Sequence, residues 1–172
     1  MVQIGNFHLG AAQTAKPPVL SSGEAYMLWD MLISRYDAVM LNQIFQNVAH
    51  DPEFRILLTE GLGDILEKQV NKLEKELNMY KIALPLRPPK SVNFEAQSGI
   101  FRDEFLFRRI FTSIQNFLDN HVRTIRTMVF NDPLRQMFIQ YTLDEVDVFN
   151  KLCKFGKMKG WLTTPPMSRQ DF

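Results

Sequence analysis

Two long stretches of the chain carry the same succession of helix signals. The first opens at Asp51-Pro52 and ends before Pro88-Pro89, and the second opens at Asp132-Pro133 and ends before Pro165-Pro166. Between these limits apolar residues recur every three or four positions, and a further segment with the same spacing precedes each stretch. This periodicity is typical of amphipathic helices. The pattern therefore predicts two helical hairpins in series.

The predicted helices cover about residues 22–48, 52–82, 102–130 and 133–159. Ser21 and Glu24 form a candidate capping box for the first helix, and Asp51 can cap the second, where Pro52 fits the first turn. The Pro-rich segment 84–89 cannot continue a helix, and the link that it opens is long enough to cross the bundle from end to end. We therefore predict an all-α fold: a ferritin-like four-helix bundle of two hairpins joined by a long Pro-rich crossover.

One domain is expected over residues 1–172, because this length suits a single core. Residues 1–20 are expected to form an irregular N-terminal arm, and residues 161–172 a C-terminal tail. The first helix is apolar around much of its circumference, as Ile33 and Leu41 widen its stripe. Such a helix is usually covered on two sides, so the arm or another subunit is expected to provide a second cover.

Gly61 and Gly63 interrupt the second helix. Asp51 and Asp132 lie 81 positions apart, whereas Asn71 and Asn150 lie 79 apart, so the first copy holds two extra residues in this interval. A kink or bulge near Gly61–Gly63 would absorb them and keep the apolar face turned inward. The alternative is that the matches arose by chance and the glycines only permit close helix approach.

The bulk composition excludes several classes of protein. The formal net charge is +1, which provides no overall field to attract nucleic acid or an acidic membrane. The single Cys153 cannot form an intrachain disulfide and fits a reducing compartment. The start of the chain lacks the pattern of a secretory signal, and no run of about 18 apolar residues is present. A cytoplasmic protein without nucleic-acid or membrane partners is expected.

A ferritin-like outline raises the question of a di-iron site. Such a site needs a Glu from each of two helices and a Glu-x-x-His motif from each of the other two. No Glu of this chain is followed by a His at that spacing, so we expect no intact di-iron centre. His121, Glu145 and Asp64 could still meet as a degenerate metal site, or could simply hydrogen-bond one another. The second interpretation is favoured, and no catalytic, cofactor-binding or metal-binding residue is assigned.

Two weaker signals also have plain structural explanations. The helix at 102–130 interleaves phenylalanines, Phe105 and Phe107 among them, with arginines, as in proteins that stack on single-stranded nucleic acid. Acidic residues on the same helix balance much of that charge, so a role in the core is favoured. Cys153 lies among apolar positions and is expected to be an inert buried thiol.

Several markers at helix ends resemble one family of proteins. They are the opening 16–24 (Lys-Pro-Pro-Val-Leu-Ser-Ser-Gly-Glu) with Leu28-Trp29, the Leu-Pro-x-Arg-Pro-Pro stretch at 84–89, and Lys159-Gly160-Trp161-Leu162 before Pro165-Pro166. These markers are similar to those of an uncharacterised ferritin-like family of spore-forming bacteria, whose members are labelled as spore coat proteins of the coat protein F type. The resemblance covers nearly the whole chain. It supplies no catalytic residues to carry over.

The resemblance implies a non-enzymatic structural or interaction protein, associated with sporulation or the spore coat. It also implies self-association as a homo-oligomer such as a dimer, because many relatives carry this unit twice. Other coat proteins are further partners that the resemblance implies. The location implied is the cytoplasm or the spore coat. A metal- or small-ligand-binding ferritin-like protein centred on His121 and Glu145 is the alternative.

Overall fold

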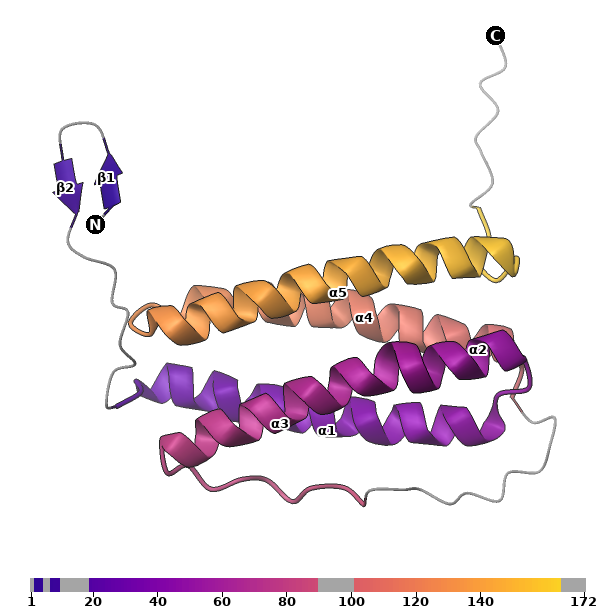
Figure 1. Ribbon diagram of the computed structural model, residues 1–172, viewed down its shortest axis with the longest axis horizontal. Helices are drawn as coiled ribbons and strands as arrows, with labels where there is room; N and C mark the ends of the chain where they lie inside the picture. The colour runs from indigo at the N-terminus through magenta and orange to yellow at the C-terminus, as the bar shows by residue number, and fades with distance from the viewer. Residues whose placement is uncertain (1, 5–6, 10–18, 90–100, 165–172) are drawn as a thin grey trace, which may run out of the picture.

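Four helical rods form the body of the protein (Figure 1). A computed structural model describes residues 2–4, 7–9, 19–89 and 101–164. The first rod is α1 (Ser22–Val48); the second is built from α2 (Pro52–Ile56), the π-helix η1 (Leu57–Gly63) and α3 (Asp64–Met79); the third and fourth are α4 (Asp103–Thr127) and α5 (Asp132–Met158). The first two rods form one hairpin and the last two another, and α1 packs on α4 between them. The predicted four-helix arrangement is thus confirmed.

The helix starts follow the local signals in the sequence. Ser21 Oγ accepts a hydrogen bond from the backbone N–H of Glu24 at 3.3 Å, and the Glu24 carboxylate accepts one from the backbone N–H of Ser21 at 3.0 Å. Asp51 caps α2 by accepting from the N–H of Phe54 at 2.9 Å. Asn131 caps α5. These side chains satisfy N–H groups that have no partner within a helix.

The second rod contains the bulge expected near its glycines. Seven residues, Leu57–Gly63, adopt π-helical hydrogen bonding, which accommodates additional residues in a helix without breaking it. The carbonyl of Leu58 accepts hydrogen bonds from the side chains of Asn42, at 2.9 Å, and Gln46, at 3.1 Å, both on α1. A Cβ atom on Gly61 would meet nothing closer than 3.9 Å. Close helix approach therefore does not explain Gly61, whereas a Cβ atom on Gly63 would lie 3.7 Å from the Asn42 side chain of α1.

Two apolar clusters fill the bundle. One occupies the end where α1 begins and contains Leu32, Leu73 and Phe138, while the other lies toward the end of α1 and contains Phe54, Phe107 and further aromatic rings. The glycine that ends the fourth rod, Gly160, has φ +71°, and the chain then folds Trp161 back onto Phe54, Phe107 and Phe155. The start of the expected tail therefore belongs to the core.

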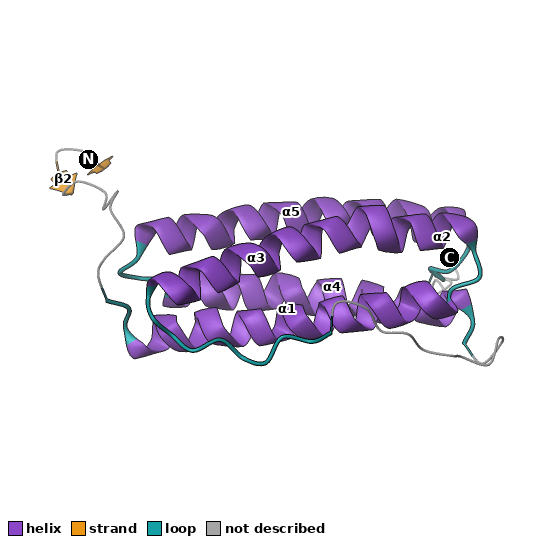
Figure 2. Ribbon diagram, turned by 60° about the horizontal axis from the view of Figure 1, so that its bottom comes forward, coloured by secondary structure: helices purple, strands orange, loops and turns teal. Residues whose placement is uncertain are grey.

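The Pro-rich chain that follows α3 covers part of α1 (Figure 2). The indole of Trp29 donates to the carbonyl of Ala83 at 3.1 Å, and Val39 lines a small hollow together with Pro88 and Pro89. Arg87 anchors this chain by pairing with Glu67 and Glu74 of α3. Part of the second cover expected for the wide apolar helix thus comes from this segment.

The N-terminal region differs from its prediction. Val2–Ile4 (β1) and Phe7–Leu9 (β2) pair as an antiparallel two-stranded hairpin, so the arm expected to be irregular contains regular structure there. The rest of the arm at 10–18, part of the crossover at 90–100 and the tail at 165–172 lie outside the described residues. None of the helices in the described ranges is both long and apolar enough to cross a lipid bilayer.

Candidate functional site

Each of the four rods contributes one buried polar side chain to the centre of the bundle. They are Arg35 of α1, Gln69 of α3, His121 of α4 and Glu145 of α5, with exposed fractions of 1, 3, 0 and 3%. Each occupies a position where the helical period turns the side chain inward among apolar neighbours. Groups of this kind are seldom buried without a partner, because removing a charge from water is costly.

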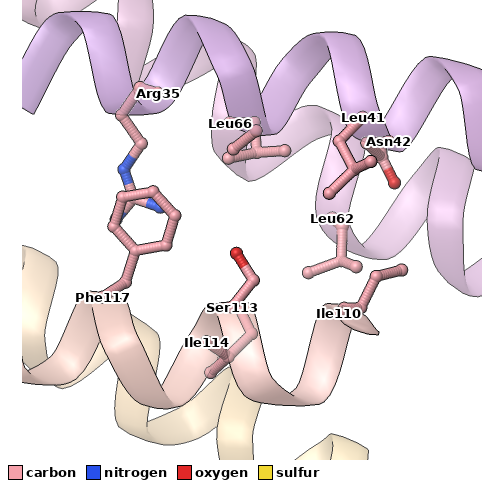
Figure 3. A pocket seen from close by; sticks show the side chains of 10 residues that line it. Arg35, Leu41, Asn42, Leu62, Leu66, Ile110, Ser113, Ile114 and Phe117 are labelled. Carbon is pink, nitrogen blue, oxygen red and sulfur yellow. The ribbon is translucent and has the colours of Figure 1, made fainter. Parts of the chain in front are cut away.

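Arg35 joins the two titratable members of this group. Its Nη2 atom lies 2.7 Å from Nε2 of His121 and 2.7 Å from Oε2 of Glu145. The guanidinium also lies over the ring of Phe117, 3.8 Å from its centroid, and Figure 3 shows the two side chains against each other. One positive charge is therefore held by a carboxylate, an imidazole nitrogen and an aromatic face.

This geometry fixes where the proton of His121 lies. Arg35 has only donors, so the Nε2 atom that faces Nη2 at 2.7 Å has to accept, and the ring proton is on Nδ1. Burial lowers the pKa of His121 from its ordinary value of 6.5, and the charge of Arg35 acts in the same direction, although Glu145 opposes it. His121 is thus a neutral acceptor at pH 7.

Glu145 carries the negative charge of the cluster. Burial by itself would raise the pKa of its carboxyl group, but Arg35, which donates to it and carries a positive charge, holds the pKa below its ordinary value of 4.5. The 3.4 Å contact between Nε2 of His121 and Oε2 joins two acceptors, so we assign the stabilisation of the carboxylate to the guanidinium. The centre of the bundle is therefore a closed pair of opposite charges.

Several buried polar atoms of the cluster have no hydrogen-bond partner within the described residues. They are Nε of Arg35, both amide atoms of Gln69, Nδ1 of His121 and Oε1 of Glu145. A cavity of about 40 Å³ lies beside Arg35, between α1 and α4, and the unpartnered Oδ1 of Asn42 also lines it (Figure 3). A cavity of this size has room for a water molecule, although most of its lining is apolar.

The structure brings together two of the three residues proposed as a degenerate metal site. His121 and Glu145 meet, but Asp64 is exposed and lies outside the cluster, so its assignment was wrong. Asp64 was matched to Glu145 through the 81-residue offset, whereas beyond the π-helix the offset is 79, which places Leu66 opposite Glu145 instead. Leu66 is indeed buried.

The donors present do not fit a di-iron centre. Among the described residues no group of three or more His, Cys, Asp and Glu side chains is placed to hold a metal ion. The cation at the centre is Arg35, which has no lone pair to offer a metal. Sequence reasoning missed this residue, although an arginine within the apolar stripe between Leu32 and Tyr36 was a readable signal.

The two weaker candidates lie away from the centre. Phe107 is fully buried, as the core interpretation predicted, but Phe105 is 42% exposed and stacks on Phe101 at a surface hollow. Cys153 is a free thiol and is only partly buried, rather than enclosed as expected.

Comparison with known proteins supports this description of the fold. The crystal structure of a "putative spore coat protein" from Bacillus halodurans C-125 matches with a TM-score of 0.79 and 22% identity, and the match covers 90% of this chain and 100% of that one. No curated protein matches the chain. The model of a family described as "Protein of unknown function (DUF3231)" matches residues 10–171. The chain therefore belongs to the DUF3231 family.

Proposed function

We propose that this chain is a non-enzymatic structural or interaction protein associated with sporulation, and with the spore coat in particular. It acts through its helix surfaces and through self-association. Its interior serves to fix the alignment of the four rods relative to one another. The bundle is ferritin-like in topology, with the Pro-rich link as its crossover, but its centre is no longer a redox site.

The position of Arg35 is the observation that carries this proposal. In ferritin-like enzymes the centre of the bundle holds metal ions between carboxylates and histidines. Here the positive charge comes from the side chain of Arg35. Its Nη2 atom donates hydrogen bonds to Oε2 of Glu145 and to Nε2 of His121, each at 2.7 Å. The groups best suited to chemistry are thus engaged with one another, which favours a role in specifying the structure.

Two contacts support the crossover topology. Asn131, at the start of α5, donates to the hydroxyl of Tyr80, just after α3, at 2.7 Å. The carboxylate of Asp103, at the start of α4, accepts from the backbone N–H groups of His50 and Asp51, at 2.9 and 2.8 Å, beyond the end of α1. The end of α3 and the start of α4 thus lie at opposite ends of the bundle. A link between them has to run its whole length.

The association with sporulation is supported by the similarity of this chain to other proteins. The matching crystal structure, described as that of a "putative spore coat protein", has the same fold at 22% identity, and the helix-end markers resemble a family with that label. Fold alone does not determine function, so location is the property to test. A fluorescent fusion of the full chain, expressed from its own promoter in a sporulating host, is expected to gather on the developing spore. An even distribution throughout sporulation would refute the association, and the unfused fluorescent protein is the control.

Binding of a small polar ligand or a metal at the cluster is the second candidate. It is favoured by the unpartnered atoms of Arg35, Gln69, His121 and Glu145. Calorimetric titration with Fe(II), Zn(II) and Mn(II) tests the metal form of this alternative. Saturable heat that disappears in His121→Gln would favour it over the structural role.

A further inference from the structure

The cavity beside Arg35 lies along the seam between α1 and α4, and three polar side chains are spaced along it. Arg35 and Asn42 of α1 line it seven positions apart, and Ser113 lines it from α4. Figure 3 shows Arg35 and Asn42 on opposite sides of this space, with the hydroxyl oxygen of Ser113 pointing into it between them. Apolar side chains, Leu66 and Ile110 among them, form the rest of the lining. The cavity is thus polar at both ends and at one point between them.

The two ends of the cavity offer complementary hydrogen-bonding groups. Nε of Arg35 and Oδ1 of Asn42 have no partner in the described part of the chain, and the two side chains are only 1% and 6% exposed. The Nε atom of an arginine can only donate, and the oxygen of an amide can only accept. The orientation of the Asn42 amide is defined, because its Nδ2 atom donates to the carbonyl of Leu58 at 2.9 Å. A donor therefore waits at one end and an acceptor at the other.

This complementarity selects the kind of ligand that the cavity can hold. An anion could accept from Arg35, but it would meet the oxygen of Asn42 as a second acceptor, and the guanidinium would repel a metal ion. A neutral molecule that both accepts and donates satisfies both ends. The cavity has a volume of about 40 Å³. Because one water molecule needs about 10–15 Å³ of such volume, there is room for about three.

We propose that a file of about three water molecules is bound in this cavity and links Nε of Arg35 to Oδ1 of Asn42. Seven residues of an α-helix rise about 10.5 Å, and four successive hydrogen bonds of about 2.8 Å span about 11 Å, so the file fits the distance between the two positions. The hydroxyl of Ser113 is the third partner of the middle water. Each water thus makes two or three hydrogen bonds, as buried water in proteins usually does.

The lining of the cavity also provides a route by which this water exchanges with solvent. Leu41 lines it and is 37% exposed, and Ala38 and Ser113 are half-buried. Water enters between α1 and α4 at these side chains, without unfolding of the bundle. The guanidinium of Arg35 is therefore hydrated at Nε, while its Nη2 atom donates to the side chains of the central cluster.

This inference goes beyond the proposed function and does not depend on it. It concerns a ligand that completes the interior of the bundle, and it holds whether or not the chain is associated with the spore. Its test is made on the purified protein, whereas the sporulation role is tested by location in a cell. A failure of one is thus distinguishable from a failure of the other.

Oxygen-17 magnetic relaxation dispersion of water in a solution of the full chain tests the proposal, because it counts water molecules that stay bound longer than the protein takes to tumble. Ser113→Val places an apolar side chain at the middle of the file. This variant is expected to lose a contribution equal to about three water molecules relative to the unmodified chain. Thr112 is exposed and does not line the cavity, so Thr112→Val is the matched control and should keep the full contribution. Circular dichroism checks that both variants fold.

A crystal structure of the unmodified chain tests the same point without a variant. Water oxygens are expected within hydrogen-bond distance of Nε of Arg35, Oδ1 of Asn42 and the hydroxyl of Ser113. Crystals pressurised with xenon provide the opposite test, since dry apolar cavities bind this gas. Equal dispersions for Ser113→Val and the unmodified chain, an anion bound to Nε of Arg35, or xenon in the cavity in place of water would each overturn the proposal.

Discussion

The Nη2 atom of Arg35 lies 2.7 Å from Oε2 of Glu145, and the bundle encloses both side chains almost completely. The net stability that such a pair provides is small, because both charges had to leave water. Removing only one partner is expected to lower the stability much more, since the remaining charge stays buried without compensation. The cluster is thus expected to be sensitive to single substitutions and tolerant of paired ones.

Replacing Arg35 by methionine is expected to lower the free energy of unfolding by about 3–5 kcal/mol, because Glu145 keeps its buried charge without a partner. Arg35→Met/Glu145→Leu should regain much of this loss, since both charges are removed. Denaturation by urea measures both variants. Lys151→Met is the control, because its pair with Asp147 is exposed on the surface and should change stability by less than about 1 kcal/mol. A similarly small effect for Arg35→Met would contradict the prediction.

Stability is expected to fall as the pH drops below 6.5. The pKa of His121 is lowered in the folded protein, so the unfolded chain takes up a proton near pH 6.5 that the folded one resists. The pKa of Glu145 is also lowered, which adds a second loss as the pH falls below 4.5. His121→Gln retains an acceptor for Arg35 and removes the first of these losses.

Thermal unfolding measured at a series of pH values tests this expectation. The curve for His121→Gln should be flatter than that of the unmodified chain between pH 6.5 and 4.5. His50 is 53% exposed by its side chain and serves as the control, since His50→Gln should keep most of the slope. Parallel curves for His121→Gln and the unmodified chain would show that His121 does not titrate as described.

Glu24 connects the start of α1 to the turn between α4 and α5. Its carboxylate accepts from the backbone N–H of Ser21 at 3.0 Å, and also from those of Phe130 and Asn131, at 3.1 and 3.0 Å. Glu24→Ala leaves these N–H groups unsatisfied and is expected to cost about 2–4 kcal/mol of unfolding free energy. Glu53→Ala changes an acidic residue in the first turn of α2 whose side chain is 62% exposed, and should cost much less. Chemical denaturation that gives equal values for the two would refute this role of Glu24.

Two glycines of the bundle should respond in opposite directions to alanine. A Cβ atom on Gly156 would lie 2.5 Å from the ring of Phe107, so Gly156→Ala is expected to destabilise the protein by about 1–3 kcal/mol through overpacking. The same change at Gly61 meets open space within a helical rod and should stabilise by about 0.5–1 kcal/mol. Melting temperatures of the two variants measure the contrast. A gain for Gly156→Ala would show that Phe107 moves aside at little cost.

The elements of the bundle could be predicted from the sequence because their signals are local. Ser21 and Asp51 mark helix starts through hydrogen bonds within one turn, and Pro52 fits the first turn that follows Asp51. A kink or bulge at this place was also predictable from the two-residue difference between the spacings of repeated motifs, but its π-helical form was not.

The central cluster could be predicted only in part, because it depends on which helices face one another. Helical spacing placed His121 and Glu145 on inward faces, but a charged residue such as Arg35 is assigned to the surface by default. Glu76 of α3 shows the same difficulty, since a glutamate is assigned to the surface by default and yet this one is only 6% exposed. Only the packed structure shows which partners compensate a buried charge.

The cation at the centre of the bundle, the guanidinium of Arg35, is covalently part of the chain. Its counter-ion is part of the same polypeptide, so the balance of charge inside the bundle is completed when synthesis ends. Depletion of iron or zinc in the cell would not change this charge balance, and neither chelators nor peroxide could remove the cation. The charge balance at the centre of the bundle is thus encoded in the sequence and does not depend on a metal ion taken up from the cell.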